Sequence, residues 1–180
     1  TNKELVLVDS SNNQSNIHVR FTETGDITAL YNLFKDEPFA ETKEKFQAYF
    51  DQAQEDICIF AVAEFGGKVC SMVSIHFKPA DFAPMDSNLI SQSIPEVKSL
   101  QTAPGFEGKG AASALMDFIE AEARRRGYNN LGVSVGLHAS YGKAQRMYAK
   151  RGYILDGRGV SYDGQTVPPG EMVRVDDSLT

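Results

Sequence analysis

The sequence predicts one α/β domain over residues 1–180, with a single mixed sheet that carries helices on its faces. Two apolar runs of strand type meet at Gly66-Gly67, which is the signal of a β-hairpin. Further along, a strand-like run enters a glycine-rich turn at 104–110, and an uninterrupted helical pattern follows that turn. No repeat or linker interrupts the order β-α-α-β-β-β-α-β-α-β-β, so the elements can share one core.

The first elements follow from the spacing of apolar residues. Residues 1–16 join an apolar ELVLV run to a polar DSSNNQSN stretch, and we expect an extra strand or a flexible N-terminal segment there. A strand is predicted over 17–21, and a helix follows it with Thr24 or Asp26 as the cap. A second helix is predicted over 42–54, where apolar side chains recur at three-and-four spacing: Phe46, Tyr49, Phe50 and Ala53.

The middle of the chain holds the hairpin and the strand that leads to the glycine turn. The hairpin strands are expected over 56–65 and 68–77, and a polar loop over 78–93 follows. The next strand is expected over 94–103. Its position directly before the glycines makes it a candidate wall of a binding site.

The last third of the chain predicts two helices and three strands. A helix is expected over 110–127, and arginines in its last turn suit the negative end of the helix dipole. A strand over 131–137, a helix over 140–152 capped by Ser140, and two strands within 153–175 complete the order. The core face of the first of these helices is expected to hold Ala111, Leu115, Phe118 and Ile119.

Composition and charge narrow the classes of function. The net charge of −6 argues against nucleic acid as a partner and slightly favours a cationic small substrate. No apolar run reaches about 18 residues, so no membrane span is expected, and the N-terminus lacks the features of a signal peptide. Cys58 and Cys70 lie in apolar runs, which indicates inert buried thiols and a cytoplasmic protein. Scattered histidines and the absence of paired cysteines predict no metal site.

Three glycines, Gly105, Gly108 and Gly110, surround Lys109 in the turn before the 110–127 helix. A Walker loop requires four residues between its first glycine and Gly-Lys, followed by Ser or Thr, and this turn meets neither condition. A dinucleotide fingerprint requires a third glycine where Ser113 stands. Both motifs are therefore disfavoured.

The turn still has the physical properties of an anion site. The first N–H groups of a helix have no partner within the helix, and the helix dipole favours negative charge beside them. Glycine and alanine over 108–112 would let phosphate oxygens approach these N–H groups. A tight strand-to-helix turn without a ligand is the alternative.

Residues 94–155 resemble the GNAT superfamily of acetyl-CoA-dependent N-acetyltransferases. That family has an acyl-CoA loop of the form Gln/Arg-x-x-Gly-x-Gly/Ala, then a helix, a strand, and an Ala-x-x-x-Tyr helix that ends in Gly-Phe or Gly-Tyr. The loop corresponds to 107–112 in this sequence. The second helix matches through Ala144, Tyr148, Gly152 and Tyr153.

The resemblance implies a GNAT-like fold, with a mixed, mostly antiparallel sheet flanked by helices. It further implies that strands 97–103 and 131–137 splay apart to hold acetyl-CoA, the co-substrate. Two positions depart from the family pattern, because Glu107 stands where Gln or Arg is usual and Tyr141 stands where Asn is common. The residues expected to bind acetyl-CoA are Leu100, Gln101, Thr102, Glu107, Gly108, Lys109, Gly110, Ala111, Ala112 and Tyr141.

Two side chains are the predicted catalytic groups. Tyr148 matches the tyrosine that hydrogen-bonds the CoA sulfur in the family, although a packing role within the helix is the alternative. Glu96 lies eleven positions before Glu107, a spacing that matches the catalytic glutamate of histone-type members, although a solvated glutamate would look the same. Glu64 and His76 are the reserve candidates for the base.

The acceptor is expected to be a small-molecule amine that attacks directly in a ternary complex, in a pocket formed by 35–42, 78–93 and 158–170. An antibiotic, a polyamine, an amino acid and a protein amine all fit the acidic and aromatic residues of these segments. A catalytically silent acyl-CoA-binding domain is the alternative function, and another acyl donor or an alcohol acceptor is a third. A homodimer is possible, and no metal is expected.

Overall fold

The computed structural model describes residues 16–38, 40–77 and 94–180. The chain divides into two compact units, one of Thr1–His76 with Val97–Asn129 and the other of Phe77–Glu96 with Asn130–Thr180. Each unit is described by itself, and a single domain over 1–180 stays a prediction. Except for Asn16, the expectation for the N-terminal segment 1–16 lies outside the described residues, as does that for the loop 78–93.

The first unit is built on antiparallel strands joined by the predicted hairpin. Its strands are β1 (Ile17–Phe21), β2 (Cys58–Phe65), β3 (Lys68–His76) and, from Val97 on, β4 (Glu96–Thr102), hydrogen-bonded in the order β1-β2-β3-β4. The double glycine between β2 and β3 has positive φ at both positions, as a tight hairpin requires. Both cysteines are buried and free, as the apolar runs predicted.

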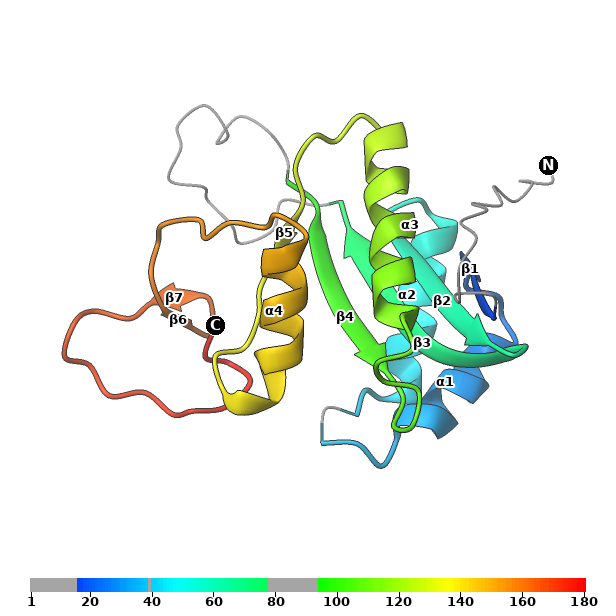
Figure 1. The fold of residues 1–180 in the computed structure, drawn as a ribbon, viewed down its shortest axis with the longest axis horizontal. Coiled ribbons are helices and arrows are strands. Elements are labelled where there is room, and N and C mark those ends of the chain that lie inside the picture. Colours follow the sequence, from blue (N-terminus) through cyan, green and yellow to red (C-terminus); the bar gives the residue numbers. More distant parts are fainter. Residues whose placement is uncertain (1–15, 39, 78–93) are drawn as a thin grey trace. The chain divides into compact units, whose positions relative to one another are not determined.

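Three helices cover the two faces of this sheet. Figure 1 shows α3 (Ala111–Arg125) across the near face, with α1 (Asp26–Phe34) and α2 (Lys43–Gln54) behind the strands. The α1 and α2 side of the core is closed by residues with almost no solvent exposure: Ile27, Leu30, Phe34, Phe46, Phe60, Val62 and Met72.

The predicted cap of α1 is wrong. Gly25 occupies the cap position and makes no side-chain hydrogen bond, and Asp26 is already the first helical residue. The Asp26 carboxylate instead accepts from the Glu23 N–H at 2.7 Å and from both terminal nitrogens of Arg20, at 2.6 and 2.9 Å. Arg20 also donates to Glu64 at 2.8 Å, so the Asp26 carboxylate belongs to an ion-pair network with Arg20 and Glu64.

The helix α3 begins and ends as its sequence predicts. It starts after Gly110, and the expected face is buried at Ala111, Leu115 and Ile119. At its other end Gly127 has φ of 88°, and the Tyr128 N–H reaches back to the Ala123 carbonyl at 3.0 Å. This backbone conformation favours glycine and stops the helix.

The second unit holds α4 (Gly142–Lys150), preceded by a 3₁₀ turn at Ala139–Tyr141. The predicted Ser140 cap is wrong, because Ser140 lies within that 3₁₀ turn and its hydroxyl hydrogen-bonds the His138 ring at 2.9 Å. The cap position of α4 belongs to Tyr141, which makes no capping hydrogen bond with its side chain.

The long strand expected over 131–137 is also wrong. Only β5 (Gly132–Val133) is extended and paired, through a hydrogen bond from the Gly132 N–H to the Pro95 carbonyl at 2.9 Å. Further along, the Leu137 N–H donates to the Leu179 carbonyl at 3.0 Å, so this end of the segment bonds the C-terminal residues.

The two strands expected within 153–175 shorten to a small hairpin. The hairpin consists of β6 (Ser161–Tyr162) and β7 (Gln165–Thr166), joined by a turn in which both central residues have positive φ. Glycines with positive φ and two adjacent prolines interrupt the rest of the segment, which prevents a continuous ladder. As a result, three apolar side chains of this segment are at least 92% exposed: Ile154, Leu155 and Met172.

His76 ends β3 and packs against α2 within the first unit. Its ring meets Tyr49 edge-on, with 5.3 Å between the ring centroids. Its Nε2 atom is buried and has no hydrogen-bond partner in the described part of the chain. Burial, with the positive charges of Lys98 and Lys45, lowers the pKa of His76 to about 4. The imidazole is therefore neutral at pH 7.

This low pKa predicts a stability that falls in mild acid. The unfolded chain takes up a proton at His76 near pH 6.5, whereas the folded chain resists until about pH 4, so stability is lost between these values. After allowance for partial exposure, we expect His76→Phe, which keeps an aromatic ring at this position, to remove about 1–2 kcal/mol of that loss in the free energy of unfolding. Urea unfolding at pH 7 and pH 4 measures the difference. His18→Phe is the control, and an equal effect of both variants would contradict the assignment.

Candidate functional site

The glycine turn before α3 has the backbone that an anion site requires. Gly105, Gly108 and Gly110 have φ of 80°, 73° and 93°, in the region that favours glycine over every other residue. The Ala114 N–H is the first to bond back within the helix, to the Gly110 carbonyl at 2.9 Å. The N–H groups before Ala114 at the start of α3 have no partner in the helix, and small residues surround them.

Lys109 adds a cation that is already held in place. Its Nζ atom lies 4.8 Å from the centroid of the Phe65 ring and 4.9 Å from that of Phe106. The two rings meet edge-on at 6.0 Å, so they form a small aromatic platform under the ammonium group. The expected charge of the turn is therefore present, and its side chain is restrained before any ligand arrives.

Two buried serines of β3 fix β4 beside them. The Ser71 hydroxyl donates to the Gln101 carbonyl at 2.6 Å, and the Ser74 hydroxyl donates to the Lys98 carbonyl at 3.2 Å. The Ala103 N–H donates to the Cys70 carbonyl at 2.8 Å. Lys98, Gln101 and Ala103 thus all direct backbone groups toward β3.

In a regular strand, the backbone groups of residues 98 and 101 would point to opposite edges, because these directions alternate with each residue. The extra residue is Ser99, whose φ of 52° places it in the left-handed region, as in a β-bulge. Because Gln101 and Ala103 direct backbone groups toward β3, alternation predicts that those of Leu100 and Thr102 point to the opposite edge of β4. This edge can pair with an extended ligand.

A tyrosine from α2 meets the bulge. The Tyr49 hydroxyl lies 3.2 Å from the Ser99 hydroxyl, and its ring contacts His76. The sequence pattern places Tyr49 on an apolar helix face and does not predict its contact with Ser99. The signal for a polar contact is the phenol within a stripe of phenylalanines, since a buried tyrosine usually has a hydrogen-bond partner.

Tyr148 lies in α4 of the second unit and is 7% exposed. Its ring meets Tyr153 edge-on at 5.5 Å. Burial raises the pKa of Tyr148 to about 12. The hydroxyl therefore keeps its proton at every physiological pH, which suits a hydrogen-bond donor.

Tyr141, the second predicted tyrosine of this unit, is held by its neighbours. Its hydroxyl donates to an Asp177 carboxylate oxygen at 3.1 Å, and its ring meets His138 edge-on at 4.8 Å. A Cβ atom at Gly136 would lie 2.4 Å from the ring, so only glycine leaves room for it. Burial and the Asp177 carboxylate raise the pKa of Tyr141 above its usual value.

The candidate bases differ in their surroundings. Glu96 is the first residue of β4 and is partly buried. Glu64 is bound by Arg20 and lies 3.6 Å from His18, which makes it part of a structural ion-pair network. His76 is neutral at pH 7 but has a low pKa, and a weak base is a poor proton acceptor from an amine.

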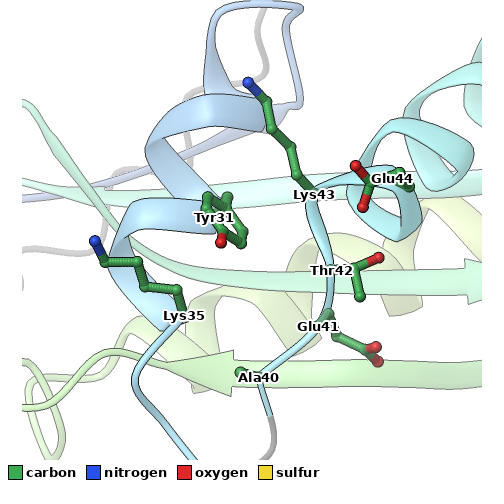
Figure 2. A pocket seen from close by; sticks show the side chains of 7 residues that line it. All are labelled: Tyr31, Lys35, Ala40, Glu41, Thr42, Lys43 and Glu44. Carbon is green, nitrogen blue, oxygen red and sulfur yellow. The ribbon is translucent and has the colours of Figure 1, made fainter.

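A pocket of about 460 Å³ opens between α1 and α2 in the first unit (Figure 2). We call it the α1–α2 pocket, and it includes part of the segment expected to bind the acceptor. The segments 78–93 and 158–170, also expected to line the acceptor pocket, lie respectively outside the described residues and in the second unit. The pocket is lined by Tyr31, Lys35, Ala40, Glu41, Thr42, Lys43 and Glu44.

Within residues 16–38, 40–77 and 94–180, no group of three or more His, Cys, Asp and Glu side chains could hold a metal ion. No helix in that part of the chain is both long enough and apolar enough to cross a bilayer.

Comparison with known proteins agrees with the geometry of the turn. The sequence model of the acetyltransferase (GNAT) family matches residues 27–153. An uncharacterized N-acetyltransferase of Mycobacterium bovis is 40% identical over 62 residues, which are 34% of this chain and 38% of that protein. The matched region thus spans less than half the length of the curated relatives.

Solved structures of acetyltransferases share the fold. A predicted acetyltransferase with acetyl-CoA from Clostridium acetobutylicum has a TM-score of 0.59 at 20% identity, over 77% of this chain and 90% of its own. AAC(6')-Iy in complex with the bisubstrate analogue CoA-S-monomethyl-acetylneamine has a TM-score of 0.67 at 14% identity, over 82% and 97%. The mixed, mostly antiparallel sheet with flanking helices is therefore the expected GNAT fold, and the chain belongs to the acetyltransferase (GNAT) family.

Proposed function

We propose that the protein transfers an acetyl group from acetyl-CoA to an amine. The observation that carries this proposal is the turn at 105–110, where three glycines with positive φ uncover the first N–H groups of α3. A phosphate oxygen can reach these groups because no side chain stands in the way. Membership of the acetyltransferase family supports acetyl-CoA as the ligand of this turn.

The first unit would hold the cofactor through its backbone. The pyrophosphate would accept hydrogen bonds from the N–H groups of 107–112, with Lys109 adding charge. The pantetheine arm would pair with the backbone of β4 at Leu100 and Thr102, as an added strand does. The predicted backbone contact at Gln101 does not fit this edge, because the Gln101 carbonyl accepts from Ser71 on the β3 side. The bulge at Ser99 supports this proposal, because it turns the Leu100 N–H to the open edge, where it can stabilise the oxyanion of the thioester.

The chemistry would be a direct attack of the amine in a ternary complex. The nitrogen–carbon bond forms, the carbon–sulfur bond breaks, and two protons must move. Glu96, directly or through a water, would take the proton that the amine loses. Tyr148 would donate to the departing thiolate, and Tyr141 would contact the cofactor.

The pKa of about 12 at Tyr148 limits what this residue can do. A thiol has a reference pKa of about 8.5, so a complete proton transfer from the phenol is uphill. A low-dielectric cleft raises the pKa of the CoA thiol as well, which reduces the difference between the two pKa values. We propose that Tyr148 acts first as a hydrogen-bond donor and gives up its proton only as the thiolate separates.

The acceptor is proposed to be a small-molecule amine. AAC(6')-Iy binds a bisubstrate analogue that joins CoA to acetylneamine, which supports this class. A silent acyl-CoA-binding domain is the second candidate, and the buried phenol of Tyr148 argues against it. We further propose a cytoplasmic protein, with a homodimer as one possible assembly.

Binding at the turn is tested by thermal unfolding with acetyl-CoA. A saturating excess of about 100 times the Kd should stabilise the protein by about 2.7 kcal/mol and raise its melting temperature. Gly110→Val should abolish this shift, because its side chain would cover the N–H groups. Gly127→Val is the control, since it places the same residue at positive φ beyond the opposite end of α3. If the unaltered protein shows no shift, the proposal is wrong.

The role of Tyr148 is tested by Tyr148→Phe, which deletes only the hydroxyl. Turnover in a thiol-release assay should fall by roughly 100- to 10,000-fold, while the acetyl-CoA shift is kept. Tyr153→Phe is the matched control, because it removes a hydroxyl from the ring that packs on Tyr148. Full turnover in Tyr148→Phe, or a parallel loss of stability and turnover, would identify a packing residue.

Glu96→Gln tests the base. The substitution keeps the size of the side chain and removes its basicity, so the rate at neutral pH should fall about 100-fold with unchanged acetyl-CoA affinity. The pH–rate profile should lose its acidic limb. Glu55→Gln, at an exposed helix end, is the control. An unaltered profile would assign the base to another group.

A further inference from the structure

The charges of the α1–α2 pocket do not match those of the segment that forms it. The segment 35–44 carries four acidic and two basic side chains. Asp36 and Glu37 do not line the pocket, whereas Lys35 and Lys43 do. The lining therefore carries equal numbers of cations and carboxylates, and the acidic character of the loop does not extend into the pocket.

Ion pairing shifts this balance toward positive charge. Glu41 is neutralised by Lys45, with 3.0 Å between the two charged groups. In the described part of the chain, neither the Lys35 nor the Lys43 ammonium group has an ion-pair partner, and the Glu44 carboxylate has none either. The lining thus has two ammonium groups and one carboxylate without an ion-pair partner in the described part of the chain.

The positive and negative groups of the pocket also lie on different sides of the segment 40–44. In the view of Figure 2, the Lys35 and Lys43 ammonium groups and the Tyr31 ring lie to the left of the segment 40–44. The Glu41 and Glu44 carboxyl groups lie to its right. The side toward α1 therefore offers two ammonium groups and a phenol, which are hydrogen-bond donors suited to an anion.

One helix joins this pocket to the bulge of β4. The Lys45 ammonium group on α2 pairs with Glu41 of the pocket. The same ammonium group lies 5.9 Å from the centroid of the Tyr49 ring, one turn further along the helix. Tyr49 in turn reaches Ser99. The rise from Lys43 to Tyr49 is about 9 Å, at 1.5 Å per residue. A small molecule can span that distance.

We propose that the α1–α2 pocket binds an anionic group, a carboxylate or a phosphate, of the amine acceptor. The acceptor would place its anion at Lys35, Lys43 and the Tyr31 hydroxyl, and its amine toward Leu100. This inference rests on the proposed function, and it replaces the slight preference for a cationic small substrate that the net charge suggested. Phosphate and carboxylate share the required chemistry, and the experiment separates them.

The test compares amines that differ only by an anionic group. Glucosamine 6-phosphate is paired with glucosamine, and ω-amino carboxylates of increasing length are paired with alkylamines of the same length. With acetyl-CoA and low salt, the anionic member of at least one pair should show a kcat/KM about ten-fold higher, as two exposed ion pairs allow. Added salt should reduce this preference.

Two variants connect the preference to the pocket. The double variant Lys35→Ala, Lys43→Ala should lower kcat/KM for the anionic amine to that of its neutral partner, mainly through KM. The loss in kcat/KM should be about ten-fold larger for the anionic amine than for its neutral partner. Lys68→Ala, an exposed lysine on the hairpin, is the matched control and should keep the preference. Equal kcat/KM within every pair, or a preference that survives the double variant, would overturn the inference.

Calorimetry with glucosamine 6-phosphate and with inorganic phosphate separates the two levels of the proposal. If no amine is acetylated, the transferase proposal fails, and binding of either probe still tests the pocket. Binding that the double variant abolishes and Lys68→Ala retains would support the pocket as an anion site. Absence of binding and of turnover with every anionic probe would overturn it.

Discussion

The register of β4 against β3 is the constraint on which the proposed cofactor edge of this unit depends. Two hydroxyls that are completely buried, those of Ser71 and Ser74, can be satisfied only by accepting partners within reach, and they find the carbonyls of Gln101 and Lys98. These two bonds hold both sides of the bulge at Ser99. A buried donor without a partner costs about 1–3 kcal/mol, so slippage of the strand by one residue is strongly opposed.

The proposed cofactor site of the same unit would need little side-chain chemistry. The glycine turn and the β4 edge both offer backbone N–H groups, and the one cation of the turn is restrained by Phe65 and Phe106. Backbone donors cannot rotate away, so their positions are set when the domain folds. The charged side chains of the α1–α2 pocket would then be left for the proposed selection among acceptors.

Local rules explain which parts of the fold could be predicted. The hairpin at Gly66, α2, α3 and the glycine turn each follow from periodicity or from residues that adopt positive φ, and all are present. The strands expected within 131–137 and 153–175 fail because alternation alone does not provide a partner strand. The contact of Tyr49 with Ser99 joins residues 50 positions apart, and no local pattern encodes such a distance.

The left-handed conformation of Ser99 has a consequence for the sequences that this site can accept. A position with φ of 52° accepts glycine, asparagine or aspartate, whereas a β-branched residue strongly disfavours this conformation. A randomised library at position 99, selected for acetyl-CoA binding, would therefore be depleted of valine and isoleucine despite their preference for strands. In a chain that carried one of them, β4 would straighten, strict alternation would resume from Lys98, and the Leu100 N–H would turn inward to β3. The left-handed conformation of Ser99, which is unusual in a strand, is thus what directs the Leu100 N–H away from β3.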